Sequence, residues 1–169
     1  MQMGLQEEMN GSSRGAELPP EVYALLNGTD LADKQEEAMM LITVSEDGWP
    51  HTAMLSVGEV AAASPNLLRI GLWQGTETSG NLKRAGKAAL VLVYQGKVNY
   101  LKLQVKPLPA SRESAYPRDR FEAELAGVKQ DTAKYAEIVS GIRIALHDPP
   151  EVVKRWEATV RDLVREEED

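Results

Sequence analysis

Between residues 40 and 106, short apolar segments alternate with tight turns, and this succession constrains the fold more than any other feature. The segments MLITVS and PHTAMLSVGEV flank an Asp-Gly turn typical of a β-hairpin. AALVLVY (88–94) and VNYLKLQV (98–105) are joined by a Gln-Gly-Lys turn, and in the second of these Tyr100 and Lys102 face away from the leucines. Strands at hairpin spacing favour a small antiparallel barrel over a doubly wound sheet, which needs a helix between parallel strands.

The remaining segments predict a six-stranded antiparallel barrel with flanking helices, a mainly β (α+β) fold. NLLRIGLW (66–73) and IVSGIRIAL (138–146) have the apolar character of a third and a sixth strand. Short helices are expected at 19–28, 30–39, 79–85, 119–126 and 131–137. Pro149 and Pro150 open a final helix whose apolar residues fall on one stripe, which indicates that it packs on the rest of the chain.

The length of 169 residues suits one compact domain. Residues 1–18 are polar and include Gly-Ser-Ser, so we expect a flexible N-terminal segment followed by a single domain at 19–169. The sequence has no cysteine, which excludes disulfides, thiolate catalysis and thiolate metal sites. Because it has only two histidines, His51 and His147, no metal site is predicted.

The net charge of −7, with acidic and basic residues mixed, argues against a nucleic-acid surface because the phosphates would be repelled. No apolar run approaches the roughly 20 residues that span a bilayer, and the N-terminus lacks a basic-plus-apolar signal pattern. We therefore expect a cytoplasmic protein with neither a nucleic-acid nor a membrane partner.

The segment LWQGTETSGNLKRAG (72–86) has two interpretations. A strand ends near Trp73, and hydroxyl residues precede a helix, whose first N–H groups lack intrahelical acceptors and attract anions. In one interpretation these hydroxyls hold a phosphate, assisted by Lys83 or Arg84. In the other, Thr78 or Ser79 only caps the helix, and the pattern alone favours the cap.

His51 also has two interpretations. It is either an acid–base group or ligand beside a flavin, haem or substrate, or a half-exposed residue next to a turn, which is the commoner case. The sequence has no Ser–His–Asp arrangement, G-x-S-x-G elbow, P-loop or G-x-G-x-x-G fingerprint. A hydrolase or a kinase is therefore disfavoured, and no catalytic side chain is assigned.

In the order of its motifs, the stretch 41–106 resembles the FMN-binding split-barrel family, the pyridoxamine 5′-phosphate oxidase-like proteins. The matching segments are LITVSEDGWPHTAMLSVGEV, LLRIGLWQGTETSGNLKRAGKAALVLV and VNYLKLQV. The resemblance implies a six-stranded antiparallel split β-barrel that forms a homodimer, with two FMN sites between the subunits. For the segment 107–137 the sequence leaves two interpretations open, a lid over this groove or a peripheral addition.

The same resemblance implies a set of flavin-binding positions. They are Ala53, Met54, Leu55 and Ser56 along the flavin ring, Leu72 and Trp73 beside it, Thr76, Thr78, Ser79 and Asn81 in the phosphate-holding turn, and Tyr100 and Lys102 on a bordering strand. The oxidases have an arginine and a lysine where this chain has Ala53 and Gly58, and an Arg-Lys pair at Glu77 and Thr78. Hydroxyls and backbone amides would therefore hold the phosphate here.

Two classes of function follow from the resemblance. The first is an FMN-dependent oxidoreductase acting on an unknown small substrate, in which the flavin supplies the redox chemistry. The second is a non-catalytic module that stores or senses FMN or haem, with His51 as the haem ligand to test. A deazaflavin in place of FMN is a third, weaker alternative.

Overall fold

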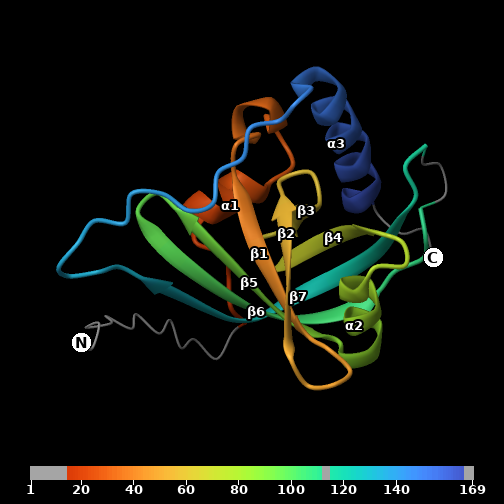
Figure 1. Ribbon diagram of the computed structural model, residues 1–169, viewed down its shortest axis with the longest axis horizontal. Coiled ribbons are helices and arrows are strands. Elements are labelled where there is room, and N and C mark those ends of the chain that lie inside the picture. The colour runs from red at the N-terminus through yellow and green to blue at the C-terminus, as the bar shows by residue number, and fades with distance from the viewer. Residues whose placement is uncertain (1–14, 112–114, 166–169) are drawn as a thin grey trace.

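The computed structural model describes residues 15–111 and 115–165, so most of the segment expected to be flexible, residues 1–14, lies outside the described residues. The elements in chain order are α1 (Pro20–Leu26), the 3-10 helix η1 (Leu31–Lys34), β1 (Ala38–Val44), β2 (Pro50–Ser56), β3 (Val60–Ser64), β4 (Leu67–Trp73), α2 (Glu77–Ala85), β5 (Lys87–Tyr94), β6 (Lys97–Pro107), β7 (Arg118–Asp131) and α3 (Pro149–Val164) (Figure 1).

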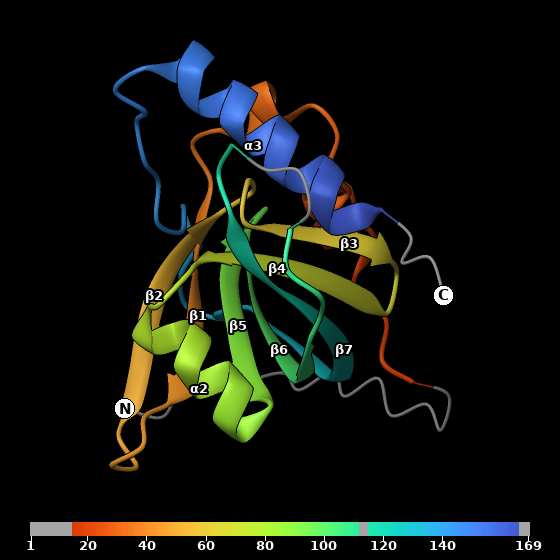
Figure 2. The ribbon, with the colours of Figure 1, turned by 90° about the vertical axis from the view of Figure 1, so that its right-hand side faces the viewer.

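The seven strands form one strongly curved antiparallel sheet in the order β2-β1-β5-β6-β7-β4-β3. Helix α3 lies across β3 and β4, while α2 packs beside β1, β2 and β6 (Figure 2). This arrangement confirms the antiparallel split barrel with flanking helices that the sequence predicts. The sheet has seven strands rather than the six expected.

Alternation along β6 shows how the sequence builds the core. Leu101 and Leu103 are fully buried and Val105 nearly so, whereas Tyr100 and Lys102 are exposed on the opposite face. This confirms the two faces read from the sequence, since successive strand residues point to opposite sides of the sheet. Burial of the apolar face inside the curved sheet, at about 25 cal/mol per Å² of apolar area, fixes the register.

One predicted strand is in fact two. The run expected as a single strand from 50 to 60 turns after Ser56, where the Glu59 N–H donates to the Ser56 carbonyl at 3.2 Å. The Gly58 N–H also donates to the Ser56 hydroxyl at 3.2 Å, so the turn is closed by polar groups of its own residues. The chain then returns as β3, which pairs with β4.

The prediction of helices at 119–126 and 131–137 is wrong. Residues 118–131 form β7, a central strand, and the residues after it form a loop. Glu, Ala and Leu give FEAELAG a high helix propensity, but pairing with both β6 and β4 overrides it. Much of the segment 107–137 is therefore part of the barrel rather than a lid or a peripheral addition.

Two further predictions are corrected. The segment 138–146 is not a strand, because it makes only an isolated bridge between Glu37 and Arg143, and Val139 is 90% exposed. The helix expected at 30–39 is limited to η1, since β1 already begins at Ala38. The helices at 19–28, 79–85 and after Pro149 are confirmed as α1, α2 and α3. Within the described ranges, no helix has the length and apolar character to cross a membrane.

Candidate functional site

Helix α2 begins where the sequence predicts a cap or a phosphate-holding turn. After β4 ends at Trp73, the chain turns at Gly75, whose φ of 78° favours glycine. The Thr76 hydroxyl then accepts a hydrogen bond from the Ser79 N–H at 3.2 Å. The N-cap is thus Thr76, two residues before the first of the candidate caps, Thr78 and Ser79.

The other polar side chains of this turn point into the protein. Thr78, Ser79 and Asn81 are 5%, 1% and 3% exposed. Ser79 donates a hydrogen bond to Asp119 on β7, and the Asn81 amide donates to the Thr43 hydroxyl on β1 at 3.0 Å. These bonds fasten α2 to the sheet, so the Ser79 and Asn81 side chains have a structural role.

His51 on β2 joins the start of α2 to the first hairpin. Its Nδ1 lies 3.3 Å from Glu77 Oε2, and its Nε2 lies 3.1 Å from Thr78 Oγ1. The Ser45 hydroxyl donates to the other carboxylate oxygen of Glu77 at 2.8 Å. Glu77, His51 and Thr78 form this series of carboxylate, imidazole and hydroxyl only in the folded chain. No sequence motif therefore predicts it.

This His51 cluster orients side chains rather than exposing a nucleophile. The Thr78 hydroxyl is buried, so a substrate carbonyl has no direct path to it. Both ring nitrogens of His51 are within hydrogen-bond distance of a partner, so iron coordination would have to break one of these contacts. Within the described ranges, no group of three or more His, Asp or Glu side chains is arranged to hold a metal ion.

At the N-terminus of α2, backbone N–H groups rather than charged side chains are the main groups that could bind a phosphate. The N–H groups of Glu77 and Thr78 are the first two of the helix and have no intrahelical acceptor. The exposed Thr76 hydroxyl lies beside them. The two side-chain cations of this helix, Lys83 and Arg84, are both exposed, and Lys83 pairs with Asp119 at 3.2 Å. These groups fit an anion with limited cationic support.

The positions predicted to lie along a flavin ring are divided between core and surface. Leu55 and Leu72 are buried at 4% and 6% exposure, and Ser56 is also buried. Met54 is 53% exposed and Trp73 is 49% exposed. β2 is an edge strand of the sheet, so the exposed Met54 lies at an open border of the sheet. Ala53 is half-buried opposite Leu41.

Tyr100 and Lys102 lie elsewhere in the sheet. They belong to β6, which is separated from β2 by β1 and β5. The Lys129 ammonium group lies 5.9 Å from the centre of the Tyr100 ring. Within one chain these two residues therefore face a different part of the surface from the α2 turn.

The position of Gly58 explains one departure from the oxidase pattern. A Cβ atom on Gly58 would lie 2.1 Å from Cγ of Trp156, which is buried at 5% exposure on α3. No side chain of any size fits there unless the indole moves. Helix α3 thus occupies the space in which the oxidases' lysine would begin.

A group of charged residues beside Trp73 was not found from the sequence. Arg118 on β7 stacks on the indole, with its guanidinium carbon 3.3 Å from the ring centroid, and Arg155 on α3 lies 6.0 Å from the same ring.

The carboxylate that interacts electrostatically with both arginines is Glu59, in the turn before β3. Burial raises the pKa of Glu59, although hydrogen bonds from Ser56 and the two arginines oppose this. Burial and the neighbouring Arg155 charge lower the pKa of Arg118. The prediction of a helix at 119–126 hid this alignment, because Arg118 faces Trp73 only when paired as a strand.

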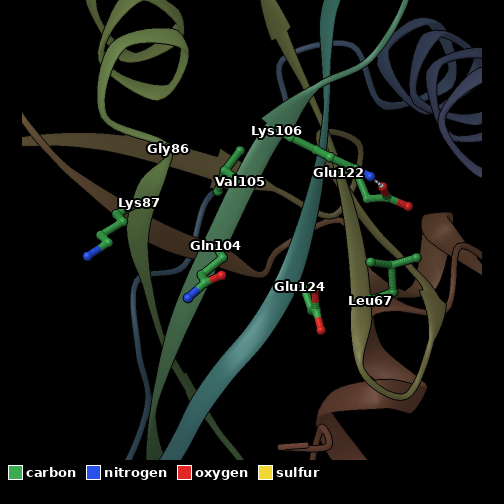
Figure 3. A pocket seen from close by; sticks show the side chains of 8 residues that line it. All are labelled: Leu67, Gly86, Lys87, Gln104, Val105, Lys106, Glu122 and Glu124. Carbon is green, nitrogen blue, oxygen red and sulfur yellow. Dashed lines mark ion pairs between the residues drawn. The ribbon is translucent and has the colours of Figure 1, made fainter.

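A groove of about 470 Å³ lies away from all of these residues, across the outer surface near the end of α2 (Figure 3). It is lined by Leu67, Gly86, Lys87, Gln104, Val105, Lys106, Glu122 and Glu124. Lys106 and Glu122 form an ion pair at 3.0 Å. The mixed charges favour no ligand of a single sign, and none of the predicted flavin-binding positions lines it.

No protein-family model matches the sequence. The chain is 49% identical over 144 residues to the uncharacterized protein YclD of Bacillus subtilis (strain 168), covering 85% of this chain and 94% of YclD.

Solved structures share the fold at low sequence identity. The structure of a candidate pyridoxamine 5′-phosphate oxidase from Lactobacillus delbrueckii matches with a TM-score of 0.53 and 18% identity, covering 66% of this chain and 93% of that one. HupZ of Group A Streptococcus matches with a TM-score of 0.52 and 11% identity, covering 76% of this chain and 99% of that one. At these identities the likeness is one of fold.

Proposed function

The chain belongs to the same family as YclD and has the split-barrel fold of the pyridoxamine 5′-phosphate oxidase-like proteins, and from this premise we propose that it binds FMN and acts as a flavin-dependent oxidoreductase on a small molecule. The observation that carries the proposal is the meeting of three elements. Helix α2 packs against both β2 and β4, so the exposed Met54 and Trp73 belong to the elements that adjoin the helix N-terminus.

The chain's own residues would hold the two ends of the flavin differently. The phosphate would accept hydrogen bonds from the N–H groups of Glu77 and Thr78 and from the Thr76 hydroxyl, and the helix dipole would favour its negative charge. Met54 and Trp73 would border the ring and exclude water from it. When bound, the flavin supplies the hydride or electron transfer.

Comparing FMN with riboflavin tests this placement, because riboflavin lacks only the phosphate. Thr76→Asp keeps an N-cap oxygen but adds a negative charge, and Thr76→Asn keeps the cap without the charge. Thr76→Asp is expected to weaken FMN binding by about tenfold, through repulsion of the phosphate, and to leave riboflavin binding unchanged. Fluorescence titration of both ligands measures the ratio. Equal loss for both flavins, or no loss of FMN binding with Thr76→Asp, would place the phosphate elsewhere, and a larger loss with Thr76→Asp than with Thr76→Asn separates the effect of the charge from that of the hydroxyl.

A non-catalytic flavin store is the second candidate, because the cationic groups that grip the phosphate in the oxidases are missing here. The space at Gly58 is filled by Trp156, and Glu77 puts a carboxylate in the turn. Anaerobic addition of NADH or NADPH to the FMN-loaded protein separates the two candidates. Bleaching of the flavin absorbance, reversed by air, supports the oxidoreductase, whereas an unchanged spectrum with either donor supports the store.

We also propose that the chain forms a homodimer with the flavin sites between subunits. Tyr100 and Lys102 are exposed on the face of β6 opposite its buried leucines, and β1 and β5 separate β6 from β2, so we expect them to border a flavin held at a partner's α2 turn. Light scattering during size-exclusion chromatography is expected to give twice the chain mass of 18.6 kDa. A monomer that nevertheless retains FMN would exclude this arrangement.

A further inference from the structure

Two arginine side chains meet at the indole of Trp73, and we propose that they form a binding site for an oxyanion, the phosphate or carboxylate group of a small molecule. The site lies between β4, β7 and α3; it shares Trp73 with the border of the proposed flavin ring but contains none of the phosphate-binding groups assigned to the α2 turn. Phosphate binding at this site is measured on the flavin-free protein, so the test does not depend on the proposed function.

Three elements that are distant in sequence bring these groups together. Trp73 and Arg118 are opposite each other in the register of β4 and β7, and the guanidinium stacks on the ring at 3.3 Å. Arg155 approaches the same ring from α3 at 6.0 Å, where the helix lies across β3 and β4 (Figure 2). The indole thus stacks on the Arg118 guanidinium, and the Arg155 guanidinium lies near the same ring.

The charges at this place are not balanced. Arg118 is 5% exposed, yet in the part of the chain that the structure describes neither Arg118 nor Arg155 forms an ion pair with a carboxylate. Glu59 is the carboxylate whose charge acts on both, and it already accepts hydrogen bonds from the Ser56 N–H and hydroxyl. Two cations against one occupied carboxylate leave a net positive charge in a largely buried setting, which ordinarily requires a counter-ion.

The hydrogen-bonding groups are also incomplete. The Nε atoms of Arg118 and Arg155 are both buried, and no described residue accepts a hydrogen bond from either. Nη1 of Arg118 donates a hydrogen bond to the Tyr116 carbonyl at 3.3 Å. A guanidinium presents its donors as a planar fork that matches the oxygens of phosphate or carboxylate. An oxyanion would supply both the missing charge and the missing acceptors.

The site is open enough to be reached. Trp73 is 49% exposed and Arg155 is half-buried, so both side chains are accessible to solvent. A purely structural cation–π stack is the competing explanation, and it makes a different prediction. A stack that only packs α3 against the barrel would bind no anion, and its loss would change stability alone.

Inorganic phosphate is the probe, added to the flavin-free full-length chain and followed by titration calorimetry, with chloride at equal ionic strength as the reference. Arg155→Met removes one member of the site. Arg161→Met removes the same charge from an exposed position on the same helix and is the matched control. We expect saturable phosphate binding in the wild type and in Arg161→Met, and at least about tenfold weaker binding in Arg155→Met.

Arg118→Lys provides a second variant, because a buried arginine replaced by a neutral residue risks misfolding. It keeps the charge but loses the fork, and it is expected to weaken phosphate severalfold while circular dichroism remains native. No saturable phosphate binding in the wild type, or equal binding in Arg155→Met and Arg161→Met, would overturn the proposal.

The source of the oxyanion is distinguished by repeating the titration on the FMN-loaded protein. If FMN abolishes phosphate binding and riboflavin, which has the same ring, does not, the arginines hold the phosphate of the flavin itself. If phosphate still binds, they hold the acidic group of a second molecule, and competition by acetate tells whether a carboxylate is accepted. Each of these results upholds the site and assigns its ligand.

Discussion

Replacing Gly58 by alanine tests the packing of α3 on the barrel with a single methyl group. The new Cβ would lie 2.1 Å from Cγ of Trp156, 2.2 Å from Cδ1 and 2.5 Å from Cδ2. These distances are far below van der Waals contact, and the atoms it meets belong to a rigid ring rather than to the end of a flexible side chain. Trp156 is buried, so the ring can move only if α3 moves with it.

The expected cost follows from this geometry. Overpacking a core by one methyl costs about 1–3 kcal/mol, and a clash with an aromatic ring belongs at the upper end, near 3 kcal/mol. For a chain of 169 residues this lowers the melting temperature by roughly 6–12 °C. Urea denaturation of the flavin-free protein measures the free energy of unfolding directly.

Gly80→Ala is the matched control, because Gly80 lies within α2 and nothing lies within 4 Å of its added Cβ. The same chemical change is expected to stabilise the protein there by roughly 0.5–1 kcal/mol, since alanine favours helix. The two substitutions should therefore have opposite signs.

The Trp156→Leu background identifies the cause. If the indole is the obstacle, Gly58→Ala should cost less by about 1 kcal/mol or more when leucine stands at position 156. A Gly58→Ala variant within about 0.5 kcal/mol of the wild type would refute the packing explanation. An equal cost in both backgrounds would place the strain in the turn backbone instead.

Two further substitutions probe single polar groups. Asn81→Ala leaves the Thr43 hydroxyl and the Arg84 guanidinium without their amide partner, and thermal unfolding should show a loss of about 1–3 kcal/mol, whereas no loss would mean that water replaces both bonds. Glu59→Gln tests a pH dependence: burial raises the folded-state pKa of Glu59 above its ordinary 4.5, so its contribution to stability is full below that value and is lost as the pH rises through the raised pKa. The stability of the wild type relative to Glu59→Gln should therefore fall as the pH rises above 4.5 in urea denaturation, and a constant difference would contradict the assignment.

Sequence patterns predicted the hairpins and helices that depend on interactions between residues close in the chain. The hairpins of β1 with β2 and β5 with β6 follow from alternation and turn residues, and α3 follows from its prolines and apolar stripe. β7 could not be predicted in this way, because its residues favour a helix and only its two neighbouring strands make it extended.

The candidate site was likewise predicted only in part. The turn before α2 is visible in the sequence, but the direction of its side chains is not: Thr78 and Ser79 meet His51 and Asp119, which are distant in the chain. The arginine site was hidden for the same reason. Arg118 and Arg155 become neighbours only after β7 and α3 have docked on Trp73.

The place of β7 in the sheet sets the order in which this molecule can be completed. The first 107 residues contain six of the seven strands, but β3 and β4 join the other strands only through β7. A chain emerging from the ribosome would therefore hold two separate groups of strands, each with an open edge, until residue 131 is available. The final strand to be synthesised closes both edges at once, so the barrel is expected to form late and in a single cooperative step.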